Sequence, residues 1–105
     1  MGNRISFHFK CANGNSAPLF SQEDGIDLVE EASAYIKWLN EEVPWSTETP
    51  LSRREKGIVM LDYLRWFYER NDIDLVEMGL ALGEMTNDDH GHYEVNASDA
   101  EWNRY

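Results

Sequence analysis

The segment Arg4-Ile5-Ser6-Phe7-His8-Phe9-Lys10 alternates apolar and polar side chains along its length. Because successive side chains of a β-strand point to opposite faces, this pattern predicts a half-buried strand. The side chains expected in the core are Ile5, Phe7 and Phe9. Those expected on the opposite face are Ser6, His8 and Lys10. We expect the rest of the chain to pack around this strand.

A tight turn and a short second strand are expected next. Ala12-Asn13-Gly14-Asn15-Ser16 contains Asn-Gly, the dipeptide most typical of a two-residue hairpin turn. Pro18-Leu19-Phe20 then predicts a return strand. Proline has no N–H to donate to a neighbouring strand, so this strand should begin at Pro18 or lie at a sheet edge.

The middle of the chain predicts two helices. Ser21-Gln22-Glu23-Asp24 resembles a capping box, and apolar residues then recur at helical spacing as far as Leu39. This first helix should end before Pro44, because the residue before a proline is pushed out of helical geometry.

The second helix is expected to run to about Arg70, and two starting points compete for it. Thr49-Pro50 is a cap followed by a first-turn proline, and Ser52-Arg53-Arg54-Glu55 is a capping box. Gly57 would cost about 1 kcal/mol relative to alanine inside a helix. This glycine therefore indicates either close packing or a later start.

The C-terminal part of the chain predicts a second hairpin. Its first strand is indicated by the alternating apolar residues Val76, Met78, Leu80 and Leu82. A polar segment at 84–91 should then turn the chain into a partner strand at 92–95. The order is β-β-α-α-β-β in a single compact domain over residues 1–105. Without βαβ alternation, this order predicts an α+β fold, a four-stranded antiparallel sheet with two helices packed on one face.

Composition and charge restrict the function. The 105 residues include 20 acidic and 9 basic side chains, for a net charge of −11. An acidic surface repels phosphates and anionic lipids, so we expect no nucleic-acid or membrane partner. The single cysteine, Cys11, excludes an internal disulfide and a cysteine-based zinc site. With no long apolar run and no signal-peptide pattern, a cytoplasmic protein is expected.

The stretch Asn87-Asp88-Asp89-His90-Gly91-His92 carries the ligand types that zinc, manganese and iron bind. His8 joins this group if its strand is a neighbour. The candidate ligands are Asp88, Asp89, His90, His92 and His8. The spacing matches no specific metal motif, and a solvated turn explains the same residues. We favour the turn, and we assign no catalytic residue, metal or cofactor.

Three residues are candidates for contact with a protein partner, namely Trp45, Arg53 and Arg54. Trp45 lies in a loop, where it either anchors the loop on the core or contacts a partner. Arg53 and Arg54 stand at the start of the second helix, where the helix dipole disfavours positive charge. They either pair with Glu41 and Glu42 across the loop, which we favour, or form a partner surface.

Two short segments together resemble a known family. The chain opens Met1-Gly2-Asn3-Arg4 before its first strand, and a late Asn/Asp-rich turn leads into Gly91-His92-Tyr93-Glu94-Val95. This combination resembles a small family of microbial and phage-borne domains that has no assigned activity. The resemblance implies a compact domain of prokaryotic origin and carries over no catalytic residue.

These observations favour a small acidic, soluble accessory or regulatory protein that acts by contact with another protein. The residues favour a protein that is not an enzyme, with the metal-dependent enzyme kept as an alternative, and self-association stays open. Two alternatives remain. An acidic surface that mimics nucleic acid would inhibit a DNA-binding protein, and it predicts carboxylates on one face at phosphate-like spacing. A small metal-dependent enzyme would use the turn at 88–92, and it predicts a pocket with convergent ionisable groups.

Overall fold

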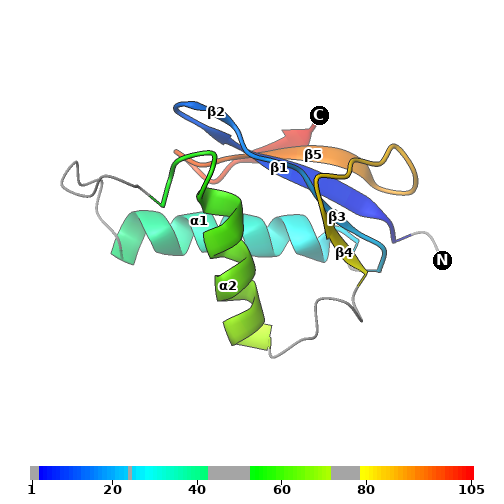
Figure 1. Cartoon of the computed structure of the whole chain (residues 1–105), viewed down its shortest axis with the longest axis horizontal. Helices are drawn as coiled ribbons and strands as arrows, with labels where there is room; N and C mark the ends of the chain where they lie inside the picture. Colours follow the sequence, from blue (N-terminus) through cyan, green and yellow to red (C-terminus); the bar gives the residue numbers. More distant parts are fainter. Residues whose placement is uncertain (1–2, 24, 43–52, 72–78) are drawn as a thin grey trace.

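The computed structural model describes residues 3–23, 25–42, 53–71 and 79–105. Within these ranges the chain forms six strands and two helices (Figure 1). The strands are β1 Ile5–Cys11, β2 Gly14–Asn15, β3 Leu19–Ser21, β4 Leu80–Leu82, β5 Gly91–Asn96 and β6 Trp102–Arg104. The helices are α1 Asp27–Glu42 and α2 Val59–Asn71. Neither helix is long and apolar enough to cross a membrane.

The strands form one mixed sheet in the order β4-β3-β1-β5-β6, and β2 pairs with the end of β1. β1 and β5 run parallel, with Ile5 opposite Gly91 and Lys10 opposite Asn96, whereas the other pairs are antiparallel. The α+β class is confirmed, but the expected four-stranded antiparallel sheet is wrong. A parallel pair needs a long connection, and both helices lie between β1 and β5 in the chain.

The expected hairpin between residues 76–82 and 92–95 is also wrong. β4 pairs with β3, and β5 pairs with β1 and β6, so two strands separate β4 from β5 in the sheet. A turn-like sequence permits a chain reversal but does not choose the strand that pairs with it. Val76 and Met78 lie outside the described residues. The sequence pattern does not predict β6, because three residues carry too little alternation.

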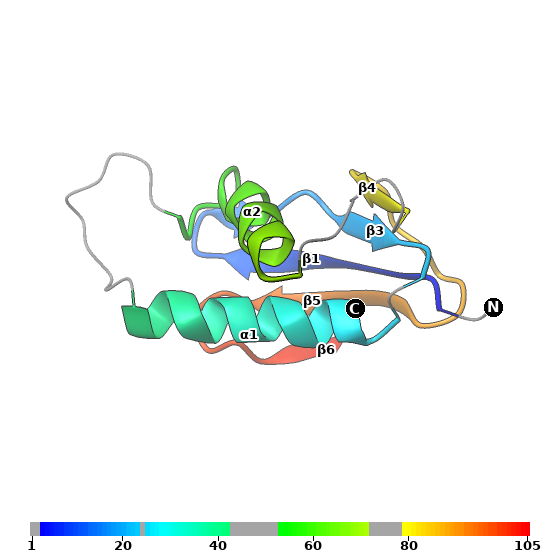
Figure 2. The same cartoon turned by 90° about the horizontal axis from the view of Figure 1, so that it is seen from below.

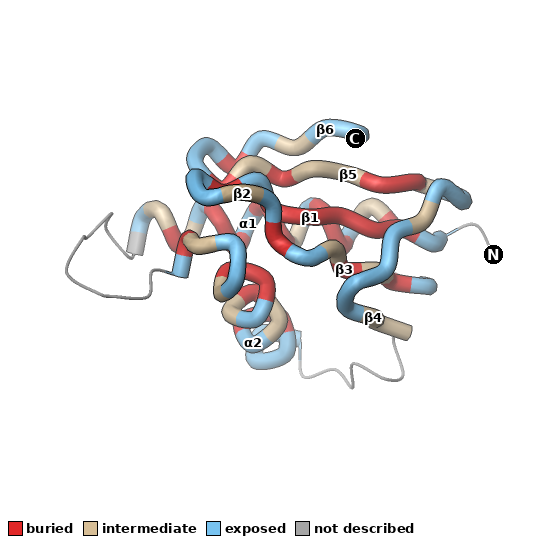
Figure 3. The backbone as a smooth tube through the Cα atoms, turned by 45° about the horizontal axis from the view of Figure 1, so that its top comes forward, coloured by how far each residue is buried: buried red, intermediate tan, exposed pale blue. Residues whose placement is uncertain are grey.

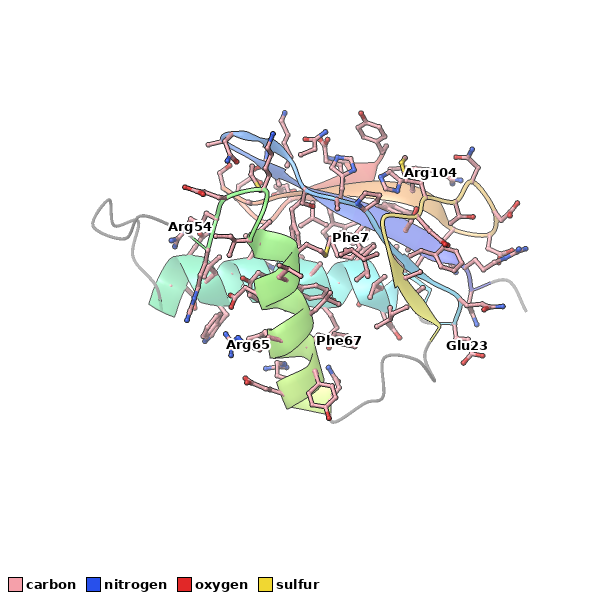
Figure 4. All side chains as sticks on the ribbon, in the orientation of Figure 1. Phe7, Glu23, Arg54, Arg65, Phe67 and Arg104 are labelled. Atoms are coloured by element: carbon pink, nitrogen blue, oxygen red, sulfur yellow. The ribbon has the colours of Figure 1, made fainter. Side chains whose placement is uncertain are left out.

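Both helices lie on the same side of the sheet, as expected, and α2 crosses α1 (Figures 1 and 2). Phe7 points from β1 into this layer (Figure 4). The prediction that Ile5, Phe7 and Phe9 form the core is confirmed, because all three are fully buried. The Phe7 ring meets those of Phe9 and Tyr63 edge to face, at centroid distances of 5.1 and 5.7 Å.

The helix ends agree in part with the sequence signals. α1 ends at Glu42, before Pro44, and carries acidic residues in its first turn. α2 begins at Val59 after a run of turns over residues 53–58, so the later start indicated by Gly57 is confirmed. The competing start at Thr49-Pro50 lies outside the described residues.

The first hairpin turn lies one residue earlier than the Asn-Gly signal indicates. Ala12 and Asn13 form the turn, and Cys11 pairs with Gly14. Gly14 has a φ of +126°, a backbone conformation that other residues rarely adopt. The glycine is therefore required beside the turn, at the first residue of β2.

Candidate functional site

β1 is buried on both faces (Figure 3). On the face away from the helices, Ser6 is 0% exposed and His8 is 5% exposed, and His92 of β5 is 5% exposed. The predicted half-buried strand is corrected here, because the polar side of β1 is covered as well. The parallel register sets Ser6 opposite His92 and His8 opposite Glu94, which brings the polar side chains of the two strands together.

These four side chains form one hydrogen-bonded series, which we call the polar chain: Ser6, His92, His8 and Glu94. Ser6 Oγ lies 2.6 Å from His92 Nδ1. His92 Nε2 lies 2.7 Å from His8 Nδ1, and His8 Nε2 lies 2.9 Å from Glu94 Oε2. Every ring nitrogen of the two histidines therefore has a partner, which offsets the cost of burying them.

Two later segments cover the polar chain. The Tyr105 ring stands edge-on to both imidazoles, at centroid distances of 4.8 Å from His8 and 5.6 Å from His92. The backbone N–H of Tyr105 donates to the His92 carbonyl at 2.8 Å. Thr86, in the segment between β4 and β5, donates its N–H to Ser6 Oγ at 2.9 Å. The cover thus comes from parts of the chain that are remote from β1 in sequence.

The electrostatics of the polar chain favour a neutral His92. Burial, followed by the nearby His8, lowers the pKa of His92 to about 4, while Glu94 acts in the opposite direction. His92 is then neutral at pH 7 and carries one ring proton. One assignment satisfies each bond. Ser6 Oγ–H donates to His92 Nδ1, His92 Nε2–H donates to His8 Nδ1, and His8 Nε2–H donates to Glu94.

This arrangement can move protons but does not present a nucleophile. A serine beside a histidine is the pairing that activates a hydroxyl for attack. Ser6, however, is 0% exposed, and its Oγ already accepts a hydrogen bond from Thr86. A substrate would have no access to the hydroxyl in this conformation.

The residues proposed as metal ligands separate into three places. Asp88 and Asp89 lie 3.5 and 3.0 Å from the Arg4 guanidinium, which lowers the pKa of Asp89. His90 lies beside Gly25 and makes none of the hydrogen bonds of the polar chain. His8 and His92 are neighbours but contact each other through their ring nitrogens. Among the described residues, no three histidine, cysteine, aspartate or glutamate side chains gather to bind a metal ion.

The interface candidates have different environments. Trp45 lies outside the described residues. Arg53 is exposed, and its Nε lies 3.8 Å from Asp62. Arg54 is only 5% exposed, and it donates to the Leu39 carbonyl at 2.9 Å. Arg54 is therefore a buried residue that binds the C-terminal end of α1 (Figure 4), and its role as an interface candidate stays a prediction.

An open groove lies between the start of α2 and β4. Its volume is about 330 Å³, and its lining residues are Asn15, Ala17, Lys56, Gly57, Met60, Leu61 and Leu82. We call it the Leu61–Leu82 groove. Leu61 is 59% exposed and Leu82 is 50% exposed, so two large apolar side chains meet solvent at one place. The sequence pattern did not indicate this groove, because its two walls are distant in the chain.

Sequence reasoning missed Ser6 and Glu94 as members of a site. The available signal was that Ser6 and His8 alternate on one strand, as do His92 and Glu94 on another. Their relation depends on the parallel pairing of β1 with β5. In comparisons with known proteins, no family model, curated protein or solved structure matches the chain. The resemblance to a microbial and phage-borne family therefore stays an expectation.

Proposed function

We propose that this protein is a small accessory or regulatory protein that binds a protein partner through the Leu61–Leu82 groove. The observation that carries the proposal is the joint exposure of Leu61 and Leu82 in one open groove. Exposed apolar side chains scattered singly are normal, whereas apolar side chains gathered in a depression are typical of binding sites. Burying the pair against a partner would remove this surface from water.

The chemistry of the groove favours an extended segment of a partner that inserts an apolar side chain. The lining is mostly apolar, and Lys56 and Asn15 supply hydrogen-bond donors that can orient a bound backbone. β4 is the last strand of the described sheet order, and a terminal strand can pair with an added one. These features support a peptide-like ligand rather than a flat interface.

The charge of the protein favours a basic partner. The net charge is −11, which attracts positive segments over long range and increases their association rate at low salt. Several carboxylates are paired with arginines, which argues against a continuous row that imitates phosphates. The paired acids are Asp62, Glu69, Asp88 and Asp89. We therefore expect lysine or arginine beside the inserted apolar residue.

The proposal is tested by selecting binders from a displayed library of random peptides. We expect enrichment of peptides in which an aromatic or aliphatic residue is flanked by lysine or arginine. Leu61→Ser and Leu82→Ser should each weaken a selected peptide by about tenfold or more, since each removes an apolar wall. Tyr68→Ser is the matched control, because Tyr68 is 49% exposed on the same helix and does not line the groove.

Three outcomes would contradict the proposal. One is a library with no enrichment, and another is binding that Tyr68→Ser weakens as much as the groove variants. The third is a stable dimer in sedimentation analysis that Leu82→Ser dissociates, because the groove would then belong to a second copy of the chain. Circular dichroism of each variant checks that the helices are retained.

A further inference from the structure

The contact between His8 and His92 requires that only one of the two facing nitrogens carries a proton. His8 Nδ1 and His92 Nε2 are 2.7 Å apart, and the imidazole rings stack at a centroid distance of 5.0 Å. A hydrogen bond at this distance has one donor and one acceptor. The hydrogen bonds of the polar chain therefore depend on how many protons the two imidazole rings carry together.

The first added proton leaves the polar chain intact. If His8 becomes an imidazolium, its Nδ1–H donates to His92 Nε2 and its Nε2–H donates to Glu94. His92 then changes tautomer, so that its remaining proton lies on Nδ1 and is donated to Ser6 Oγ. Ser6 Oγ can accept this hydrogen bond as well as the one from the Thr86 N–H. The Ser6–His92 and His92–His8 hydrogen bonds reverse direction. The His8–Glu94 bond becomes one between a cationic imidazolium and a carboxylate.

The second proton cannot be accommodated in the same geometry. With both rings charged, an N–H on His8 would face an N–H on His92, and their hydrogen bond would be lost. Two positive charges would also lie side by side in a buried site, where like charges are costly. The pair must then separate or admit water.

The groups around the pair identify what would move. Among the described residues, the charged or titratable groups on its face of the sheet include Glu94 from β5, Lys10 from β1 and the Tyr105 phenol after β6. Glu94 Oε2 already accepts from His8 Nε2 at 2.9 Å, and the Glu94 side chain is 28% exposed. Among the described residues, the contacts that hold the cover include the hydrogen bonds from Tyr105 N–H to the His92 carbonyl and from Thr86 N–H to Ser6 Oγ.

We propose that the His8–His92 pair is an acid-sensitive latch, whose double protonation releases Tyr105 and the segment around Thr86 from the outer face of the sheet. This inference goes beyond partner binding, and it does not depend on the Leu61–Leu82 groove. The low pKa of His92, about 4, agrees with a latch that stays closed at neutral pH. Released into water, His92 would return toward its ordinary pKa near 6.5, so acid favours the open form.

Amide hydrogen exchange of the full chain, followed by NMR, tests the latch. Between about pH 7 and about pH 4.5 we expect the protection factors of the Thr86 and Tyr105 amides to fall at least about tenfold. A change of this size is allowed because the pKa of His92 is about 4 in the closed form and near 6.5 in the open form. The amide of Ile36, buried in α1, should change less than about twofold. A parallel fall at Ile36 would mean acid unfolding, and unchanged protection at Thr86 and Tyr105 would mean no latch.

Substitutions assign the effect to the pair. His92→Gln keeps an amide that can bond to Ser6 and His8 but does not titrate, so the acid-dependent loss of protection should vanish. His90→Gln is the matched control, since His90 lies beside Gly25 and should leave the loss in place. If His92→Gln does not fold, the imidazole NMR titration of the wild type decides. A His92 midpoint near 6.5, uncoupled from the Thr86 and Tyr105 signals, would overturn the proposal.

Discussion

The carbonyl oxygen of Leu39 accepts a hydrogen bond of 2.9 Å from the guanidinium of Arg54. The same side chain donates from Nε to the Asn40 amide oxygen at 3.3 Å. Leu39 lies in the last turn of α1, where carbonyl groups lack partners within the helix and no basic residue of the helix supplies one. Burial lowers the pKa of Arg54, but a guanidinium stays charged at any ordinary pH. Arg54 thus ties the run of turns before α2 to the C-terminal end of α1.

We predict that Arg54→Ala lowers the free energy of unfolding by about 2–3 kcal/mol, because the buried Leu39 carbonyl and the partly buried Asn40 amide lose a charged donor. Urea denaturation monitored by circular dichroism measures the change. Arg53→Ala is the control, and it should cost less than about 1 kcal/mol, since the Arg53 side chain is 44% exposed and its Nε lies 3.8 Å from Asp62. Equal losses in the two variants would show that Arg54 has no special role.

Phe7 is a fully buried member of the aromatic core, and Phe7→Ala should cost about 3–5 kcal/mol of unfolding free energy. The side chain is 0% exposed and contacts both Phe9 and Tyr63. Phe20→Ala on the opposite face of the sheet, where the residue is only partly buried, should cost clearly less. An unchanged denaturation midpoint for Phe7→Ala would mean that the register of β1 is different.

Tyr35→Phe removes the hydroxyl that donates to Asp62 at 2.5 Å. We expect a loss of about 1.5–3 kcal/mol at neutral pH, the range for a hydrogen bond to a charged group. Burial, followed by the bond to Asp62, raises the pKa of Tyr35. The stability that the protonated phenol provides is complete below about pH 10, the ordinary tyrosine value, and declines as the unfolded chain ionises above it.

The difference in unfolding free energy between the wild type and Tyr35→Phe therefore changes with pH in a defined direction. Above about pH 10 the wild type should lose stability faster than Tyr35→Phe, so the difference between them shrinks. Urea denaturation of both proteins at several alkaline pH values measures the two slopes. Parallel slopes would indicate that the Tyr35 phenol ionises as easily in the folded protein as in the unfolded chain.

Zinc should not stabilise the untagged protein. A ligand that binds only the native state must raise the melting temperature, and the described residues hold no cluster of three metal ligands. We expect the same melting temperature with zinc, with manganese and with a chelator, and no stoichiometric metal by elemental analysis. Bound metal at near one equivalent, lost in His90→Ala, would restore the turn at 88–92 as a metal site.

The sequence by itself determined which side chains face the helices, but not that the opposite face of β1 is also covered. The alternation over residues 4–10 placed Ile5, Phe7 and Phe9 in the core, and the helical spacing after residue 24 together with Pro44 located α1. Gly57 indicated either close packing or a late start of α2, and the structure has the late start. These are local properties, because periodicity and capping depend on residues a few positions apart.

Only the tertiary structure decided which strands are neighbours. Ser6 and His92 lie 86 positions apart in the chain and meet because β1 pairs with β5 in parallel. The period of a strand indicates the face that is buried, but both of its edges offer the same backbone N–H and C=O groups to any partner. Partner choice follows from how α1, α2 and the aromatic core fit over the whole sheet. For this reason the sequence identified the two histidines, whereas the fold joined them to Ser6 and Glu94.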